Sequence, residues 1–166
     1  MIDSERQPDT RFLFQHPVHF LALGFGSGLS PIAPGTAGSL AALPLGWLLL
    51  GLPSVAPAIV VIAAAIVGIR ICGKTADALG AHDHGSIVWD EFVGLWIALL
   101  LVPAGWAWWS LAFLLFRVFD IAKPWPIGAL DKRVSGGLGI MLDDIVAGFF
   151  TGGSVWLLAT LCGHFF

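Results

Sequence analysis

Charged residues are confined to a few short segments of this 166-residue chain, and that distribution constrains its fold more than any other feature. Beyond the N-terminal residues 1–11, every charge lies in residues 70–91 or 117–144. Only 11% of the residues are charged and 57% are hydrophobic, whereas a soluble domain carries about 25% charged residues. We therefore predict an all-α integral membrane protein. The net charge of −3 argues against a nucleic-acid partner.

Several apolar stretches mark the expected membrane segments. The mixed-charge residues 1–11 lack the parts of a signal peptide, and we expect them to form a disordered cytoplasmic tail. Residues 12–25 are apolar but contain two His and one Pro, which indicates a helix lying at the membrane surface. The remaining stretches are 40–52, 55–72, 92–116 and 145–166. We expect one membrane-embedded domain over residues 12–166.

The stretch 92–116 has two interpretations. It is either one long span or a hairpin of two short helices that breaks at residues 102–105. The hairpin places the tail and both charged segments on one side, with all eight Lys and Arg residues there, as the positive-inside rule favours. We therefore favour the hairpin. It predicts a polytopic bundle with short or broken transmembrane helices, active-site loops at the cytoplasmic face and a C-terminus on the opposite side.

Two acidic pairs sit beside apolar runs, in IVWDEFVG (87–94) and IMLDDIVAG (140–148). One explanation is helix capping, because acids in a first turn gain about 0.3–1 kcal/mol each from the helix dipole. Capping accounts for one acid better than for a pair. The other explanation is metal binding, since clustered carboxylate oxygens suit Mg²⁺, Mn²⁺ or Ca²⁺. We favour metal ligands, which would be Asp90, Glu91, Asp143 and Asp144.

Basic residues and glycines surround these acids. In FRVFDIAKPWPIGALDKR (116–133), Lys123 precedes two prolines in a stiff loop that suits phosphate binding. Lys132 and Arg133 suit either a phosphate or anionic lipid headgroups. The Gly-rich segments 26–39 and 136–139 could bring backbone N–H groups close to a phosphate, although such loops are weak signals alone.

Further polar residues are compatible with more than one function. His82, Asp83 and His84 form either a metal or proton-transfer cluster or an exposed polar turn, and the sequence favours neither. The nucleophile motif GxSxG is absent, and Cys72 does not continue into the loop of Cys-dependent phosphatases. Carboxylates without such a nucleophile favour water activated by a metal. The alternative is an ion or solute transporter that uses the acids as an ion site.

Four runs of the sequence resemble one known family. The runs SPIAPGTAGS (30–39), GSIVWDEFVG (85–94), FRVFDIAKPWPI (116–127) and LDKRVSGGLGIMLDDIVAG (130–148) are similar to phosphatidylglycerophosphatase A, a bacterial membrane-lipid enzyme family. The resemblance extends over roughly residues 24–150. It implies an all-helical enzyme of the bacterial inner membrane that hydrolyses phosphatidylglycerophosphate, a phospholipid, to phosphatidylglycerol and inorganic phosphate with Mg²⁺. The Asp-rich signature of CDP-alcohol phosphotransferases is absent.

The resemblance and the residues together suggest a role for each candidate. We expect the four paired acids to bind one or two Mg²⁺ ions, and Asp120 to serve as a further ligand or a general base. We expect Lys123 and Arg133 to neutralise charge on the phosphoryl group. Contacts to phosphate or headgroup are expected from Thr36, Ser39, Lys132 and Gly137. Further candidates are His82, Asp83, His84 and Asp131.

Overall fold

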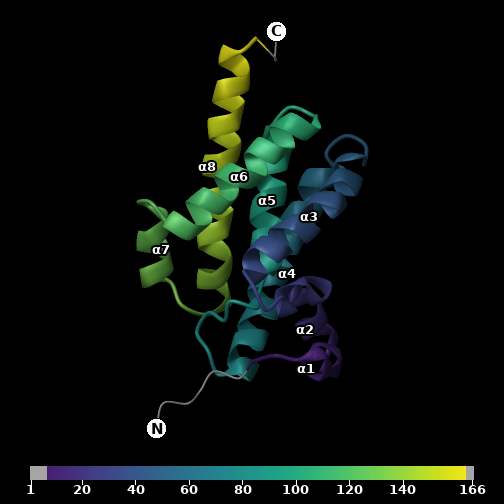
Figure 1. Ribbon diagram of the computed structural model, residues 1–166, viewed down its shortest axis with the longest axis vertical. Coiled ribbons are helices and arrows are strands. Elements are labelled where there is room, and N and C mark those ends of the chain that lie inside the picture. Colours follow the sequence, from purple (N-terminus) through teal and green to yellow (C-terminus); the bar gives the residue numbers. More distant parts are fainter. Residues whose placement is uncertain (1–6, 164–166) are drawn as a thin grey trace.

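The computed structural model describes residues 7–163, and over this range the chain is helical and contains no strand (Figure 1). The predicted all-α class is confirmed. In chain order the elements are α1 (Thr10–Gln15), α2 (Pro17–Ala22), the 3-10 segment η1 (Gly24–Leu29), α3 (Pro34–Leu50), α4 (Ala56–Leu79), α5 (Trp89–Leu101), α6 (Trp106–Ala122), α7 (Ile127–Arg133) and α8 (Gly136–Leu161).

The N-terminal region is more ordered than the sequence suggested. Residues 1–6 of the expected disordered tail lie outside the described residues, and α1 already begins at Thr10, where Asp9 accepts a hydrogen bond of 2.7 Å from the Phe12 backbone N–H. The single surface helix expected next is instead divided, because Pro17 cannot continue α1 and starts α2. Phe12 is only 2% exposed, so α1 is packed against the rest of the fold.

Two of the long helices extend past their predicted ends. α4 continues seven residues beyond Cys72, to Leu79, and therefore carries the charges at 70–77 on its last turns. α8 begins at Gly136, nine residues before the predicted start at Ile145. The predicted ends lay where charged residues begin, but neither helix ends there. A helix can run through charged residues. Those at the end of α4 are exposed on its surface, whereas Asp143 and Asp144 of α8 face other polar groups inside the protein.

The predicted hairpin is confirmed. α5 ends at Leu101 and α6 begins at Trp106; Pro103 and Gly105, whose φ is 139°, lie in the turn between them. In Figure 1 this turn and the turn between α3 and α4 lie at the same end of the molecule as the C-terminus, whereas the N-terminus lies at the opposite end. The two uncharged turns therefore share one end of the bundle.

The outer surface is that of a helical membrane protein. α4 and α8 are both long and apolar enough to cross a membrane, and α3 is a shorter apolar helix. Ile59, Ile62 and Ile66 of α4 are 60%, 60% and 62% exposed. Contiguous apolar surface of this kind is rare on soluble monomers and is typical of contact with lipid.

α5 is the central helix, and it is buried from Trp89 to Leu99. It packs against α3, α4, α6 and α8. The Trp96 side chain donates a hydrogen bond of 2.9 Å to the backbone oxygen of Ala42 in α3, and Trp89 donates one of 3.1 Å to that of Ala64 in α4. These bonds satisfy the two indole N–H groups inside the core and fix α5 relative to both neighbours.

α5 and α8 touch backbone to backbone at two glycines. A Cβ atom on Gly148 would lie 2.3 Å from the Gly94 carbonyl oxygen, and a Cβ on Gly94 would lie 2.5 Å from the Asp144 carbonyl oxygen. Small residues are what allow membrane helices to approach so closely. Because Gly94 and Gly148 belong to the two similar acidic segments, this contact brings those segments together.

Candidate active site

The two acidic pairs occupy different positions in their helices. Asp90 and Glu91 lie in the first turn of α5, where capping is a sufficient explanation for an acid. Asp143 and Asp144 lie about two turns beyond the start of α8 at Gly136. The dipole effect fades within the first turn, so capping does not explain the second pair.

Three of the acids form a buried cluster. Ligand oxygens of Asp90, Glu91 and Asp144 all lie within 4.8 Å of one another, and the three residues are 7%, 8% and 3% exposed. Each has one buried oxygen without a hydrogen-bond partner: Asp90 Oδ1, Glu91 Oε2 and Asp144 Oδ1. Buried carboxylates repel one another and lose hydration unless a cation compensates them. This set of free oxygens fits a hard divalent cation such as Mg²⁺.

The fourth expected ligand, Asp143, has a different partner. Its Oδ2 accepts a hydrogen bond of 2.6 Å from Lys123 Nζ, which also donates one of 2.6 Å to Asp131 Oδ1. Partial burial alone would lower the pKa of Lys123, but the hydrogen bonds to Asp131 and Asp143 outweigh it and raise the pKa above its ordinary value. Lys123 is therefore a stable positive charge beside the cluster at neutral pH.

Arg117 of α6 lies on another side of the cluster. Its Nη1 is 3.6 Å from Glu91 Oε1, donates to Asp120 and lies 3.4 Å from Ser39 Oγ. Its Nε is buried and has no hydrogen-bond partner. The guanidinium group is thus held by two acids while one donor stays unused. An arginine presented in this way suits a bound phosphoryl group.

The start of α3 closes the cluster from a third side. A Cβ on Gly35 would lie 2.3 Å from Glu91 Oε1 and 3.1 Å from Arg117 Nη2, so a larger residue here would displace the Glu91 carboxylate. Ser39 is fully buried and donates to the Gly35 carbonyl oxygen over 2.9 Å. Thr36 lies between them in the first turn of α3 and is half-buried. The expected phosphate-binding segment therefore does border the acids, but as a helix start.

Other candidates lie outside the cluster. Lys132 and Arg133 are exposed in the last turn of α7, whereas Asp131 reaches Lys123. Gly137 packs against α4, because a Cβ there would lie 1.8 Å from the Ile69 carbonyl oxygen. Packing alone therefore requires a glycine at position 137, and its expected phosphate contact stays a prediction.

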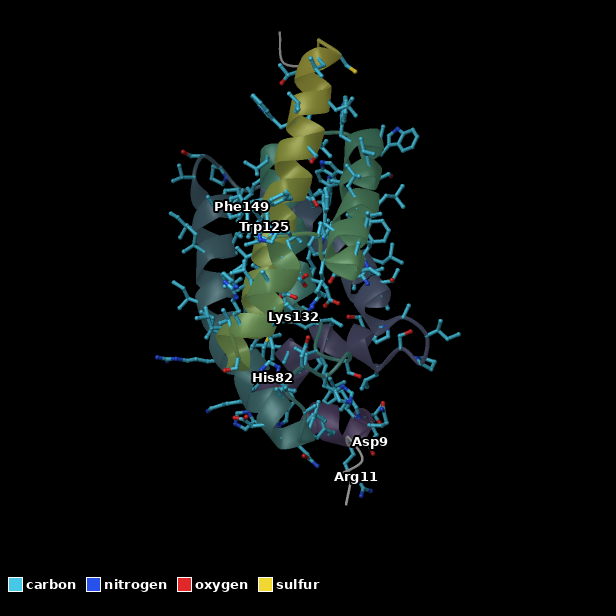
Figure 2. All side chains as sticks on the ribbon, turned by 90° about the vertical axis from the view of Figure 1, so that its left-hand side faces the viewer. Asp9, Arg11, His82, Trp125, Lys132 and Phe149 are labelled. Carbon is cyan, nitrogen blue, oxygen red and sulfur yellow. The ribbon has the colours of Figure 1, made fainter. Side chains whose placement is uncertain are left out.

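The segment between α4 and α5 separates its three candidates. His84 is 4% exposed, and its Nδ1 accepts from the Ser86 backbone N–H over 3.2 Å, which stabilises the turn before α5. His82 is exposed, and in Figure 2 it lies nearer the N-terminal end of the molecule than Lys132. Asp83 lies close enough to Lys123 to interact electrostatically. Desolvation by neighbouring atoms raises the pKa of Asp83, and Lys123 opposes that shift.

Arg117 and Gly35 were missed as site residues. One signal was present in the sequence, because Arg117 and Asp120 are spaced three residues apart and thus share a face of an otherwise uncharged helix. Gly35 lies in the Gly-rich segment 26–39, but nothing in the sequence distinguished it from the other glycines of that segment. Its importance comes from the proximity of Glu91, which is 56 positions away in the chain and is brought there by packing.

The fold and this cluster define a helical membrane protein with an acidic centre between cationic side chains, a class suited to metal-assisted chemistry on anionic ligands. Comparison with known proteins gives the family. A family model described as phosphatidylglycerophosphatase A matches residues 20–159, and the chain belongs to that family.

Curated relatives agree with this assignment. Phosphatidylglycerophosphatase A from Escherichia coli K12 is 49% identical over 90% of this chain and 87% of its own, and that from Haemophilus influenzae is 47% identical over 89% and 91%. A chain from Bacteroides thetaiotaomicron, provisionally named a phosphatidylinositol-3-phosphatase, is 41% identical over 79% of this chain and 86% of its own. No solved structure matches the chain.

Proposed function

We propose that this protein is a phosphatidylglycerophosphatase, which hydrolyses the terminal phosphate monoester of phosphatidylglycerophosphate and releases phosphatidylglycerol and inorganic phosphate. Family membership supports a phosphatase, because two relatives at 47% and 49% identity bear that name. The observation that carries the proposal is the buried cluster of Asp90, Glu91 and Asp144 with Arg117 and Lys123 beside it. Anionic ligands and cationic side chains together suit a phosphoryl group held next to a metal.

The proposed cofactor is Mg²⁺. Asp90, Glu91 and Asp144 would hold it, since each has a buried oxygen that lacks a partner. When bound, the ion would polarise the phosphoryl oxygens and lower the pKa of a bound water. Asp143 accepts a hydrogen bond from Lys123 through Oδ2 and would keep that ammonium group at the edge of the site. Its buried Oδ1 also lacks a partner and would be the fourth ligand oxygen.

The remaining steps fall to side chains of this protein. Arg117 and Lys123 would bind the phosphoryl oxygens and stabilise the negative charge that develops on them. Asp120, held by Arg117, is the best placed carboxylate outside the three-acid cluster to accept a proton from the attacking water. The Gly35–Thr36 segment at the start of α3 would contact the phosphate or the adjoining headgroup.

We further propose a multi-pass arrangement in the bacterial inner membrane, with the active site on the cytoplasmic face. The observation that supports it is that charges after the tail lie only in residues 70–91 and 117–144, whereas both uncharged turns share the opposite end of the bundle with the C-terminus (Figure 1). A reporter enzyme that works only in the periplasm should be active when it is fused after residue 166. A cytoplasmic reporter signal would contradict this topology.

Phosphate release tests the activity and the cofactor together. The purified full chain in mixed micelles should release inorganic phosphate from phosphatidylglycerophosphate, lose that activity with a divalent-cation chelator and regain it with Mg²⁺. Phosphatidylinositol 3-phosphate belongs in the same assay, because one relative's provisional name points to it. If no lipid phosphomonoester releases phosphate, the proposed phosphatase activity is wrong and the transporter alternative is favoured. If phosphate release survives chelation, only the proposed Mg²⁺ requirement is wrong.

A further inference from the structure

An apolar groove runs along the outside of the bundle between α4, α5 and α8. Its volume is about 350 Å³, and none of its accessible lining is polar. Val61, Ile62 and Ala65 line it from α4, Ile97 from α5, and Ile145 and Phe149 from α8. Within residues 7–163, α4 and α8 are the two helices long and apolar enough to cross a membrane, which places the groove between them at the depth of the hydrocarbon core.

The groove exists because α4 and α8 cross and then separate. Near their charged ends the two helices are in contact, since a Cβ on Gly68 would lie 2.5 Å from Met141 Sδ and a Cβ on Gly137 would clash with the Ile69 carbonyl oxygen. In Figure 2 the helices diverge away from that crossing, and Phe149 lies on the side of α8 that faces α4. Small side chains such as Ala65 leave the space between them open.

We propose that this groove holds one acyl chain of the phospholipid substrate and thereby positions its phosphate at the carboxylate cluster. The proposal rests on the phosphatase function above and adds a binding site for the lipid tail. Its lining begins at Ile145, the residue that follows Asp144, and continues away from the charged end to Phe149. On α5, the lining residue Ile97 lies six positions from Glu91, about 9 Å along the helix toward the uncharged end. The groove therefore begins at a depth that suits an acyl chain of a lipid whose phosphate lies at the cluster.

A second apolar hollow lies at the other end of the bundle and is less suited to the substrate. It has a similar volume of about 370 Å³, but it is lined by Trp47, Leu48 and Trp109 at the uncharged end of the bundle. No acid of the cluster lines either hollow, but only the first reaches Ile145, the residue next to Asp144. The first groove extends about 12 Å along α4 from Ala58 to Ile66, less than half of the ~30 Å hydrocarbon core. It would therefore hold only a segment of one chain.

A matched pair of variants on α4 tests the proposal. Ala65 lines the groove, whereas Ala63 is exposed on the same helix and does not line it. Because lipid tails are as apolar as the groove, its benefit should come from positioning rather than from transfer out of water. Ala65→Trp should lower kcat/KM for a long-chain phosphatidylglycerophosphate about tenfold. It should leave kcat/KM unchanged for an analogue whose chains are too short to reach the groove, and Ala63→Trp should change neither.

Cross-linking of the unaltered protein provides a measurement that does not depend on any variant. A long-chain substrate with a photoreactive group in its acyl chain should label the α8 segment that contains Phe149. Unlabelled phosphatidylglycerophosphate should compete with the labelling, and phosphatidylethanolamine, which has no phosphomonoester, should not. If both lipids compete equally, or if Ala63→Trp and Ala65→Trp have the same effect, the groove holds only ordinary bilayer lipid. Even then, phosphate release from the long-chain substrate and its short-chain analogue would still support the proposed phosphatase activity.

Discussion

Asp144→Asn is expected to abolish phosphate release, with a fall in kcat of about 10³-fold or more, because a metal's charge stabilisation is worth several kcal/mol. Asn has nearly the shape of Asp but carries no charge, so it would be a poor third ligand beside Asp90 and Glu91. Initial rates at saturating substrate and Mg²⁺ measure the effect.

The same substitution should not unfold the protein. Asp144 is 3% exposed and stands beside two other buried carboxylates, so removing its charge relieves repulsion when no metal is bound. Thermal unfolding in detergent should therefore occur at the same temperature or higher. Asp77→Asn is the matched control, because Asp77 is exposed near the end of α4 and belongs to no cluster described above. Full activity of the Asp144→Asn variant would overturn the assignment of Asp144 as a ligand.

Arg117→Gln is expected to lower kcat by about 10²- to 10³-fold, the usual effect of removing one donor that stabilises charge in the transition state. Arg117→Lys should recover only part of the activity. Arg117 contacts Glu91, Asp120 and Ser39 through Nη1 alone, whereas its buried Nε has no partner. A lysine ammonium group could replace the Nη1 contacts but lacks the further donors of the guanidinium group. Steady-state rates give kcat and KM separately.

Product inhibition separates phosphate binding from a structural role for Arg117. If the guanidinium contacts the phosphoryl group, inhibition by inorganic phosphate should weaken in Arg117→Gln along with kcat. If Arg117 only holds Glu91 and Asp120 in place, thermal stability should fall while phosphate inhibition of the residual activity stays unchanged. Arg70→Gln serves as the control, since Arg70 is exposed on α4. Wild-type inhibition by phosphate in the Arg117→Gln variant would contradict direct contact.

Patterns along the chain predicted much of the architecture. Charge location correctly divided the stretch 92–116 into α5 and α6, because neutral turns and charged segments alternate along the sequence. The same criterion misplaced the start of α8 at Ile145 instead of Gly136. It placed Asp143 and Asp144 where the helix begins, whereas they lie about two turns inside α8. Backbone hydrogen bonding does not require an apolar side chain, and inside this bundle the acids find polar surroundings.

The sequence predicted which types of residue form the site better than it predicted which of them contact one another. The paired acids and Lys123 stood out because charges at membrane depth are rare and usually functional. The packing role of Gly137 was not predicted, because a glycine that allows a helix to approach looks, in the sequence, like a glycine that admits a ligand. Arg117 was passed over because nothing near it in the chain marked it as a neighbour of Glu91.

By itself, the sequence determined that the protein is a helical membrane protein with its charges gathered at one end, because composition and spacing specify the environment that each helix requires. Only the tertiary structure decided which charges meet. The contact of Gly94 with Gly148 sets α5 against α8 so that Asp90, Glu91 and Asp144 share one centre, while Asp143 faces Lys123. Neighbouring residues on a helix point about 100° apart, so two adjacent aspartates can serve different partners once packing has fixed the helix.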